Sequence, residues 1–404
     1  MRRRKLIQAG STIGVGLLAG CAGVPFGGDG GEPESTPTVD TDPEVTDPTP
    51  ADCKPEVVSD DIEADTTWNA ADCPRVALDG NVRVTDEATL TIEPGVEVIG
   101  QSGSRLTVLD DAALVASGDP ENPVWFHGES EAPGYWQGIW IKTDNPNNSF
   151  DNVDIAHGGA NDYANIYLEG TAGNGHASVT NSTLRESATA GLIAEEGATL
   201  AEFATNEFRD NEGPAVYIPT TLAGSIDADS TYIGDNGTDA VRVSSHDVED
   251  DATWPGVPYR FDGQDHTLTD GAVTVEPGAR FTFGDGARIQ VRAGSSFTAE
   301  GTGDSPITFE GASATPGHWQ GIWIKSDNPN NSFDNVDIAH GGANDYANIY
   351  LEGTAGNGHA SVTNSTLKES ATWGIYVEEG AALVESSNNT FEDNEEGGIR
   401  RPES

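Results

Sequence analysis

The stretch WQGIWIKTDNPNNSFDNVDIAHGGANDYANIYLEGTAGNGHASVTNSTLRESAT, residues 136–189, decides the fold because it returns almost unchanged at residues 319–372. Only two positions differ: Thr143 becomes Ser326 and Arg185 becomes Lys368. The chain of 404 residues is therefore a tandem duplication, with equivalent positions 183 residues apart.

A shorter period lies inside this block. The tetrads GIWI at 138–141, NIYL at 165–168 and GLIA at 191–194 each place two apolar side chains two residues apart, as a strand with one buried face does. Similar tetrads follow from residue 89 to residue 398 at spacings of 24 to 27 residues, with one longer spacing of 32. A repeat of this length is typical of one coil of a β-solenoid.

We therefore predict an all-β fold: a single-stranded right-handed parallel β-helix (solenoid) of about 13 coils, built from two tandem copies of a 183-residue unit. Copy one is expected to extend to about residue 248, and copy two to start at about residue 249. A β-sandwich is the main alternative, but it does not explain a repeat of coil length.

The N-terminal part differs in composition from the repeats. Basic residues at 2–5 precede an apolar run that ends at Cys21, a pattern typical of a twin-arginine signal and a lipobox with a lipidated cysteine. An uncleaved anchor is the alternative, although about 15 apolar residues are too few for a spanning helix. We expect four regions: a lipoprotein signal at 1–20, a disordered acidic Pro/Thr-rich tether at 21–52, an N-terminal cap at 53–78 and the β-helix at 79–404.

The other two cysteines of the chain are Cys53 and Cys73. In an exported protein, an even pair that closes a short loop predicts a disulfide. Two free thiols are the alternative, and a metal site is disfavoured because no histidine lies nearby in the sequence.

Acidic residues dominate the composition. The chain has 67 Asp and Glu residues against 20 Lys and Arg residues, a formal net charge of −47. The carboxylates are spread over the repeats, which resembles proteins of salt-loving archaea; at molar salt the Debye length is about 3 Å, and such a surface stays soluble. Nucleic acid is not an expected partner, because no basic patch exists to release counterions.

Several coil motifs carry a family resemblance: LTIEPGVEVIG at 90–100, GDPENPVWFHG at 118–128, GYWQGIWIK at 134–142, NNSFDNVDIAHGG at 147–159 and ATNEFRDN at 204–211. They resemble coils of pectate-lyase-like right-handed parallel β-helix proteins, in particular haloarchaeal exported surface lipoproteins of unassigned function. The resemblance implies the fold over roughly residues 66–400. It implies no catalytic residue, because the Asn-Thr-Asp, Gly-His-Gly and Arg-Ile-Lys motifs of the polygalacturonase-like enzymes of this fold are missing from the sequence.

Alternation along GIWIK places Ile139 and Ile141 inside the coil and Trp140 and Lys142 outside it. The same rule predicts one outer stripe of Thr91, Val115, Trp140, Tyr167, Ile193, Tyr217, Thr274, Thr298, Trp323, Tyr350 and Tyr376. Exposed aromatic rings about 4.8 Å apart would form a strip on which sugar rings can lie. The alternative is that these rings only stabilise the sheet or lie under a loop.

A charged ladder is expected beside the stripe, with Lys142, Glu169 and Glu195 in copy one and Lys325, Glu352 and Glu378 in copy two. Two of the five lysines of the chain take one equivalent position, which indicates either a Lys–Glu pair between coils or a cation that orients an anionic sugar. The candidate glycan-binding residues are Trp140, Lys142, Tyr167, Glu169, Tyr217, Trp323, Lys325, Tyr350, Glu352 and Tyr376. Glu169 and Glu195 at about 5 Å would also suit a retaining glycosidase, but nothing in the sequence marks either as a buried acid.

Carboxylates and a histidine recur together in both copies, as Asp151, Asp154, His157 and Asp162, and as Asp334, Asp337, His340 and Asp345. These residues have metal-ligand chemistry without metal-ligand spacing, and they are the candidates for a metal site. Calcium is the one cofactor considered, bound through oxygens of Asn-, Asp- and Gly-rich loops; solvated turns are the alternative.

The expected function is that of a monomeric lipoprotein on the outer face of the cell membrane. It would bind polysaccharide or cell-envelope glycan without catalysis, and would contact the membrane through its lipid anchor only. Two alternatives stay open: a polysaccharide lyase or glycoside hydrolase acting on the same face, and a structural spacer or adhesin.

Overall fold

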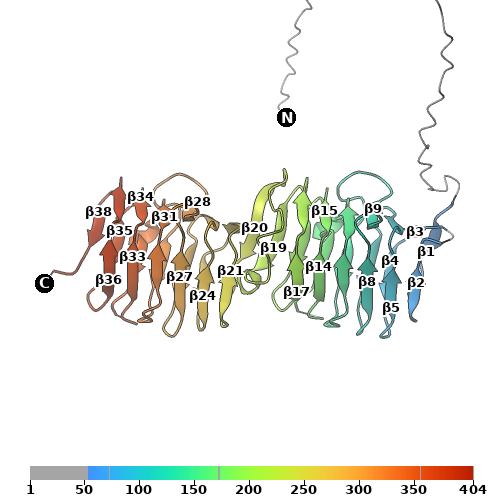
Figure 1. Ribbon diagram of the computed structural model, residues 1–404, viewed down its shortest axis with the longest axis horizontal. Coiled ribbons are helices and arrows are strands. Elements are labelled where there is room, and N and C mark those ends of the chain that lie inside the picture. Colours follow the sequence, from blue (N-terminus) through green and yellow to red (C-terminus); the bar gives the residue numbers. More distant parts are fainter. Residues whose placement is uncertain (1–52, 72, 172, 355, 404) are drawn as a thin grey trace, which may run out of the picture. The chain divides into compact units, whose positions relative to one another are not determined.

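The computed structural model describes residues 53–403 apart from positions 72, 172 and 355. The signal, the tether and Cys21, all expected within residues 1–52, lie outside the described residues. The described residues form one unit in which short strands and turns wind into a right-handed parallel β-helix, as predicted (Figure 1). In this part of the chain, no helix has the length and apolar character needed to cross a membrane.

All strand pairs of the described residues are parallel, and they form five sheets, here numbered I to V. Sheet I contains β1 (Glu56–Val58), β3 (Arg75–Leu78), β6 (Glu97–Gly100), β9 (Val124–Gly128), β12 (Val153–Ala156), β15 (Thr183–Arg185) and β18 (Glu207–Arg209). Sheet II contains β4 (Asn81–Val84), β7 (Arg105–Val108), β10 (Ile139–Ile141), β13 (Ile166–Leu168), β16 (Leu192–Ala194), β19 (Pro214–Pro219), β20 (Thr238–Ser244), β22 (Pro258–Phe261), β25 (Arg280–Phe283), β28 (Ile307–Gly311), β31 (Val336–Ala339), β34 (Thr366–Lys368) and β37 (Thr390–Glu392).

Sheet III contains β2 (Thr66–Trp68), β5 (Thr89–Ile92), β8 (Ala113–Ser117), β11 (Ser149–Asp151), β14 (His176–Thr180) and β17 (Thr199–Ala204). Sheet IV contains β21 (Ala252–Trp254), β24 (Ala272–Val275), β27 (Ser296–Glu300), β30 (Ser332–Asp334), β33 (His359–Thr363) and β36 (Ala382–Ser387). Sheet V contains β23 (Asp265–Leu268), β26 (Arg288–Val291), β29 (Gly321–Ile324), β32 (Ala347–Leu351), β35 (Trp373–Val377) and β38 (Gly397–Arg400). Three short 3-10 helices, η1 (Ala160–Asp162), η2 (Thr220–Leu222) and η3 (Ala343–Asp345), lie in the connections.

The interior of the solenoid is filled by the inward positions of these strands. In β10, Ile139 and Ile141 are buried while the residue between them is partly exposed, which confirms the alternation predicted from the sequence. Aromatic side chains stack from coil to coil in copy two, where the rings of Phe281 and Phe309 lie 4.9 Å apart and almost parallel. Burial of this apolar interior is the main stabilising contribution to a fold of this kind.

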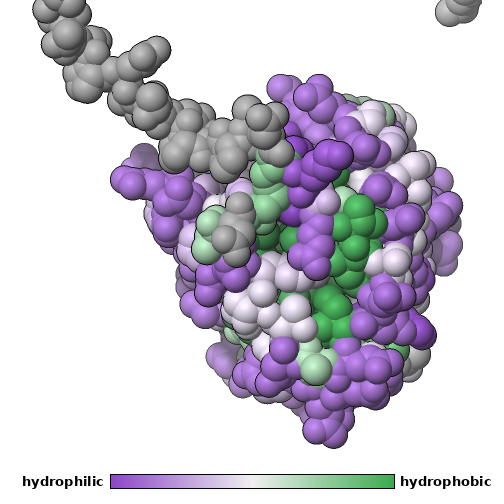
Figure 2. Space-filling model, turned by 90° about the vertical axis from the view of Figure 1, so that its right-hand side faces the viewer, coloured by the Kyte–Doolittle hydropathy of each residue, from purple (hydrophilic) through white to green (hydrophobic). Residues whose placement is uncertain are grey.

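Residues 53–78, expected as a cap, form a coil of the β-helix itself. β1 pairs with β3, Ile62 bridges to Val84, and β2 pairs with β5, so all three sides of this coil are in register with the next one. Seen from this end, apolar side chains occupy the centre and hydrophilic ones surround them (Figure 2). The apolar interior therefore extends to the first coil.

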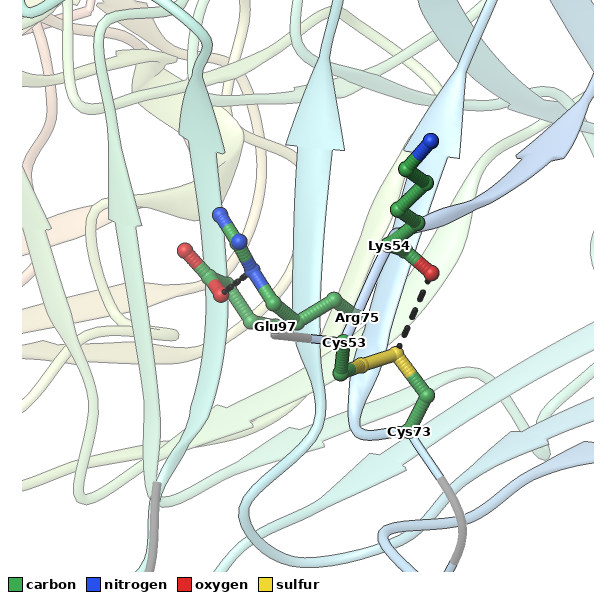
Figure 3. Close-up of a disulfide and its surroundings, with 5 residues drawn as sticks. All are labelled: Cys53, Lys54, Cys73, Arg75 and Glu97. Atoms are coloured by element: carbon green, nitrogen blue, oxygen red, sulfur yellow. Dashed lines mark hydrogen bonds and ion pairs between the residues drawn. A yellow bond between two sulfur atoms is a disulfide. The ribbon is translucent and has the colours of Figure 1, made fainter. Parts of the chain in front are cut away.

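A disulfide joins Cys53 to Cys73, with their Cα atoms 5.7 Å apart, as the sequence predicted (Figure 3). The next coils are tied together nearby, because Arg75 Nε lies 2.5 Å from Glu97 Oε2. The disulfide thus closes the loop that carries the first coil.

The two copies differ in their orientation about the solenoid axis. β9, β12 and β15 belong to sheet I, but their equivalents β28, β31 and β34 belong to sheet II. In the same way, β10 and β13 of sheet II are equivalent to β29 and β32 of sheet V. Sheet II runs without interruption through the seam at β20 and β22, so the second copy is turned by one face relative to the first.

Candidate functional site

Trp140 lies at the centre of β10 and points outward, in register with Thr107 of β7 and Tyr167 of β13. The strand starts directly after Gly138, whose φ is 100°. A Cβ atom there would lie 1.9 Å from the carbonyl oxygen of Ala164, so only glycine lets β10 approach the next coil this closely. The outward direction of Trp140 was predicted, but its side chain is half-buried rather than exposed.

Tyr163 covers one side of this tryptophan and was not predicted as part of the site. Its ring centroid lies 5.2 Å from that of Trp140 and 5.3 Å from that of Tyr167. It follows η1, and the loop is held by the fully buried Asn165, which accepts a hydrogen bond from the Gly158 N–H at 2.9 Å. Aromatic residues from one loop and two strands therefore form a single cluster.

Two cations lie against the indole of Trp140. Arg105 Cζ is 4.7 Å and Lys142 Nζ is 4.3 Å from the ring centroid. Arg105 starts β7 and Lys142 follows β10, so they approach the ring from opposite ends of the strands. Cation–π contacts of this kind contribute about 0.5–1 kcal/mol each at exposed sites. The indole face is therefore already occupied, which corrects the expectation of a free aromatic platform.

The carboxylates beside the cluster have fixed partners. Lys142 Nζ lies 3.3 Å from Glu169 Oε2, so the predicted Lys–Glu pair between adjacent coils is confirmed. Glu195 accepts hydrogen bonds from the Tyr167 hydroxyl and from the Gly170 N–H, the latter at 3.1 Å. Burial and the hydrogen bond to Glu195 raise the pKa of Tyr167 far above its ordinary value, so this phenol stays a neutral donor.

Copy two builds the same cluster on sheet V. The rings of Trp323 and Tyr346 lie 5.1 Å apart, and those of Tyr346 and Tyr350 also lie 5.1 Å apart. Tyr376 extends the cluster by stacking on Tyr350 at 4.9 Å. A cleft of about 360 Å³ opens here; it is lined by Trp323, Lys325, Asn344, Asp345, Tyr346, Tyr350, Glu352, Thr354 and Glu378.

In copy one the equivalent of Tyr376 is Ile193, which lies between Tyr167 and Tyr217 on sheet II. These three residues line a cleft of about 440 Å³. Arg242 closes the row, with Cζ 5.0 Å from the centroid of the Tyr217 ring. The two copies therefore share a core cluster but differ along the neighbouring coils.

The single stripe expected along both copies is wrong in two respects. Its tryptophans lie in different sheets, Trp140 in sheet II and Trp323 in sheet V, because the second copy is turned by one face. Its smaller members lie on other sheets again: Thr91 and Val115 in sheet III, and Thr274 and Thr298 in sheet IV.

The candidate metal residues do not converge. Asp151 and Asp154 lie on either side of Asn152, whose φ of 50° turns the chain from sheet III to sheet I. Asp151 accepts a hydrogen bond from Thr180 Oγ1 at 2.7 Å, whereas Asp154 pairs with Arg185 at 2.9 Å. Burial raises the pKa of Asp154 despite this arginine.

His157 has a third location, with Nε2 2.7 Å from Glu186 Oε2, and burial lowers the pKa of this histidine. Asp162 lines the cleft beside Tyr167. Asp334, Asp337, His340 and Asp345 are separated in the same manner: His340 contacts Glu369, and Asp345 lines the cleft of copy two. Across residues 53–403, outside the three gaps, no three His, Cys, Asp or Glu side chains are grouped to hold a metal ion. These side chains therefore do not form the candidate metal site.

Two family descriptions match the chain. Residues 60–218 match the family described as pectate-lyase-like beta helix domain, and residues 268–400 match the one described as right handed beta helix region. Comparisons with curated proteins and with solved structures found no match. The matched segments cover most of copy one and of copy two, and they agree with the parallel register of the sheets. The chain therefore belongs to the pectate-lyase-like right-handed parallel β-helix proteins.

Proposed function

We propose that the two aromatic clusters bind polysaccharide or envelope glycan without catalysis. The observation that carries this proposal is that one arrangement, a tryptophan and two tyrosines beside a lysine and two carboxylates, occurs twice at the surface of one solenoid. Apolar rings combined with a few fixed polar groups are typical of sites that bind small molecules and sugars.

The contacts indicate how a sugar would lie in the cluster. Because Arg105 and Lys142 cover the indole, the apolar face of a sugar ring would contact the two tyrosines beside it. Sugar hydroxyls would donate to Glu169 or Glu195, which are already oriented by Lys142 and by the Gly170 N–H. Groups that are fixed before binding lose little entropy when the ligand arrives.

The same contacts favour binding over hydrolysis. A retaining glycosidase needs one carboxylic acid kept protonated in an apolar environment and a second carboxylate as nucleophile. Here Glu169 is paired with Lys142, and Glu195 accepts hydrogen bonds from a phenol and a backbone N–H. Both carboxylates already have a charged or hydrogen-bonding partner, so a retaining hydrolase is the less favoured function.

We also propose that the protein is exported and held at the outer face of the membrane by a lipid on Cys21. Support comes from the basic residues at 2–5 and the Leu-Ala-Gly-Cys sequence that ends at Cys21. An acidic surface of net charge −47 suits a high-salt exterior, where carboxylates repel each other little.

The test is glycan binding by the full chain, measured on an immobilised glycan panel together with assays for reducing ends and unsaturated products. Tyr163→Ala should weaken binding by roughly 1–3 kcal/mol at copy one, the usual value of one stacked ring. Tyr163→Ala combined with Tyr346→Ala should abolish binding. Trp125→Ala is the matched control, because this aromatic side chain is 38% exposed on sheet I and belongs to neither cluster.

Binding that survives the double variant would place the interaction elsewhere on the molecule. Release of reducing ends or unsaturated products by the wild-type chain would show that the non-catalytic assignment is wrong.

A further inference from the structure

The two clusters differ in the residue that faces the arginine beside the tryptophan. Asn81 of β4 lies in register with Arg105 of β7, and Asp265 of β23 lies in register with Arg288 of β26. Residues 136–189 and 319–372, which supply the tryptophan, two tyrosines, the lysine and one glutamate of each cluster, are nearly identical. Arg400 replaces Tyr217 at the far end of the copy-two cluster, with Cζ 4.7 Å from the centroid of the Tyr376 ring. Beside the tryptophan, the charged difference is an asparagine in copy one against an aspartate in copy two.

In copy two the guanidinium is neutralised. Arg288 Nε lies 2.7 Å from Asp265 Oδ1, and Nη2 donates to Asp265 Oδ2 at 2.9 Å. Nη1 donates to Gln320 Oε1 at 2.9 Å and to the Tyr346 hydroxyl at 3.2 Å. Asp265 therefore neutralises the arginine through one charge-assisted hydrogen bond and one close contact at Nε.

In copy one the guanidinium has the same position with neutral acceptors only. Arg105 Nε donates to Asn81 Oδ1 at 3.1 Å, and Nη1 donates to Gln137 Oε1 at 3.3 Å and to the Tyr163 hydroxyl at 3.1 Å. Among the residues that the structure describes, none accepts from Nη2 or forms an ion pair with Arg105. Its position is fixed further by Trp140, since Cζ lies 4.7 Å above the indole.

We infer that copy one selects ligands that carry a carboxylate or sulfate group, whereas copy two accepts neutral sugars, and that residue 81 or 265 sets this difference. The inference rests on the proposed glycan-binding function. An arginine held in place with Nη2 free offers a charge-assisted hydrogen bond to an oxygen of a carboxylate or sulfate. In copy two the same anion would compete with Asp265 and be repelled by it. Asp162, Glu169 and Glu195 also surround the site, but each has an identical counterpart in copy two, so their effect cancels in the comparison.

The experiment titrates the full chain in dilute salt with methyl β-glucoside and methyl β-glucuronoside, which differ only in the group at C6. The indole N–H resonances of Trp140 and Trp323 report the two copies separately in a single NMR spectrum. The glucuronoside should shift the Trp140 resonance at an about tenfold lower concentration than the Trp323 resonance, because one charge-assisted pair contributes roughly 1.4 kcal/mol. The glucoside should affect both resonances alike, and added salt should reduce the difference.

Two nearly isosteric variants exchange the proposed selectivity. Asn81→Asp should remove the preference for the glucuronoside at Trp140, and Asp265→Asn should create one at Trp323. The fold should tolerate Asn81→Asp, because Asn81 Oδ1 also accepts from Thr107 Oγ1 at 2.8 Å and a carboxylate can keep this bond.

If Trp140 keeps its preference in Asn81→Asp, the inference is wrong while glycan binding stands. If both glycosides shift both resonances equally in the wild type, the inference again fails alone. If neither glycoside shifts either resonance, the proposed function fails, and the inference fails with it.

Discussion

Acidification should loosen the seam between the two copies through one buried histidine, His266 of β23. Its side chain is fully buried, with Nδ1 3.0 Å from Thr220 Oγ1 and Nε2 2.8 Å from the carbonyl oxygen of Asp262. The ring also stacks on Phe261, with centroids 4.4 Å apart. Burial lowers the pKa of His266 to about 4. The neutral imidazole is therefore the form that the folded seam accommodates.

The sign and size of the effect follow from linkage. An unfolded histidine has a pKa of about 6.5, so between pH 6.5 and pH 4 the open state binds a proton that the folded state does not. The contribution of His266 to stability is present in full above pH 6.5 and is lost as the pH falls towards 4. At pH 5 the loss amounts to about 2 kcal/mol, since each unit of pKa difference corresponds to about 1.4 kcal/mol.

Hydrogen exchange of the β22 and β23 amides measures this loss, because strands of a solenoid open locally rather than all at once. After correction for intrinsic exchange, the opening free energy of these strands in the wild type should fall by about 2 kcal/mol from pH 7.5 to pH 5. His266→Gln keeps a donor and an acceptor but does not titrate, so its β22 and β23 amides should change far less. β5 and β8 contain no histidine and serve as the internal control. An equal loss in the wild type and in His266→Gln would show that the proton is taken up elsewhere.

Three further changes have defined outcomes. Gly138→Ala should lower the melting temperature and destabilise the coil that carries Trp140 by about 3 kcal/mol or more, because the added Cβ would collide with the Ala164 carbonyl. A variant that melts at the wild-type temperature would contradict the close approach of β10. Reduction of the Cys53–Cys73 disulfide should increase hydrogen exchange in the first coil by the equivalent of about 3 kcal/mol, with little change beyond β9, and uniform loosening of all coils would argue against local closure. Cys21→Ser should release the protein from the membrane fraction, and unchanged fractionation would refute lipidation at this residue.

The strand rhythm, the inward and outward positions and the Lys142–Glu169 pair could be predicted because alternation and coil length are periodic features of the sequence. Tyr163 could not be predicted in this way. It lies in a loop after Asn161, whose φ of 57° breaks the alternation, and only its recurrence in the second block gave a signal. Arg105 was missed because the expected stripe placed Val115 of β8 next to Trp140, whereas β7, which starts at Arg105, is the strand that pairs with β10.

The rotation of copy two was missed for a different reason. The spacing of 32 residues between the tetrads at 240 and 272 indicates the seam between the copies, and one stripe was expected to continue across it. In the structure β19 and β20 are consecutive strands of sheet II, and β24 lies in sheet IV. Tetrads of one pattern do not reveal which side of the coil they occupy, because all three sides bury alternate residues.

This rotation changes what the duplication would achieve. A straight polymer lying along sheet II would meet the cluster of Trp140 but not that of Trp323, which opens from sheet V. Under the proposed function, the second cluster would therefore not raise the affinity for a single glycan chain. Each molecule would instead crosslink two separate glycan chains. The viscosity of a glycan solution should rise when protein and glycan chains are present in matched numbers. It should fall again in excess protein, because each chain is then saturated by molecules that bind it through one cluster only.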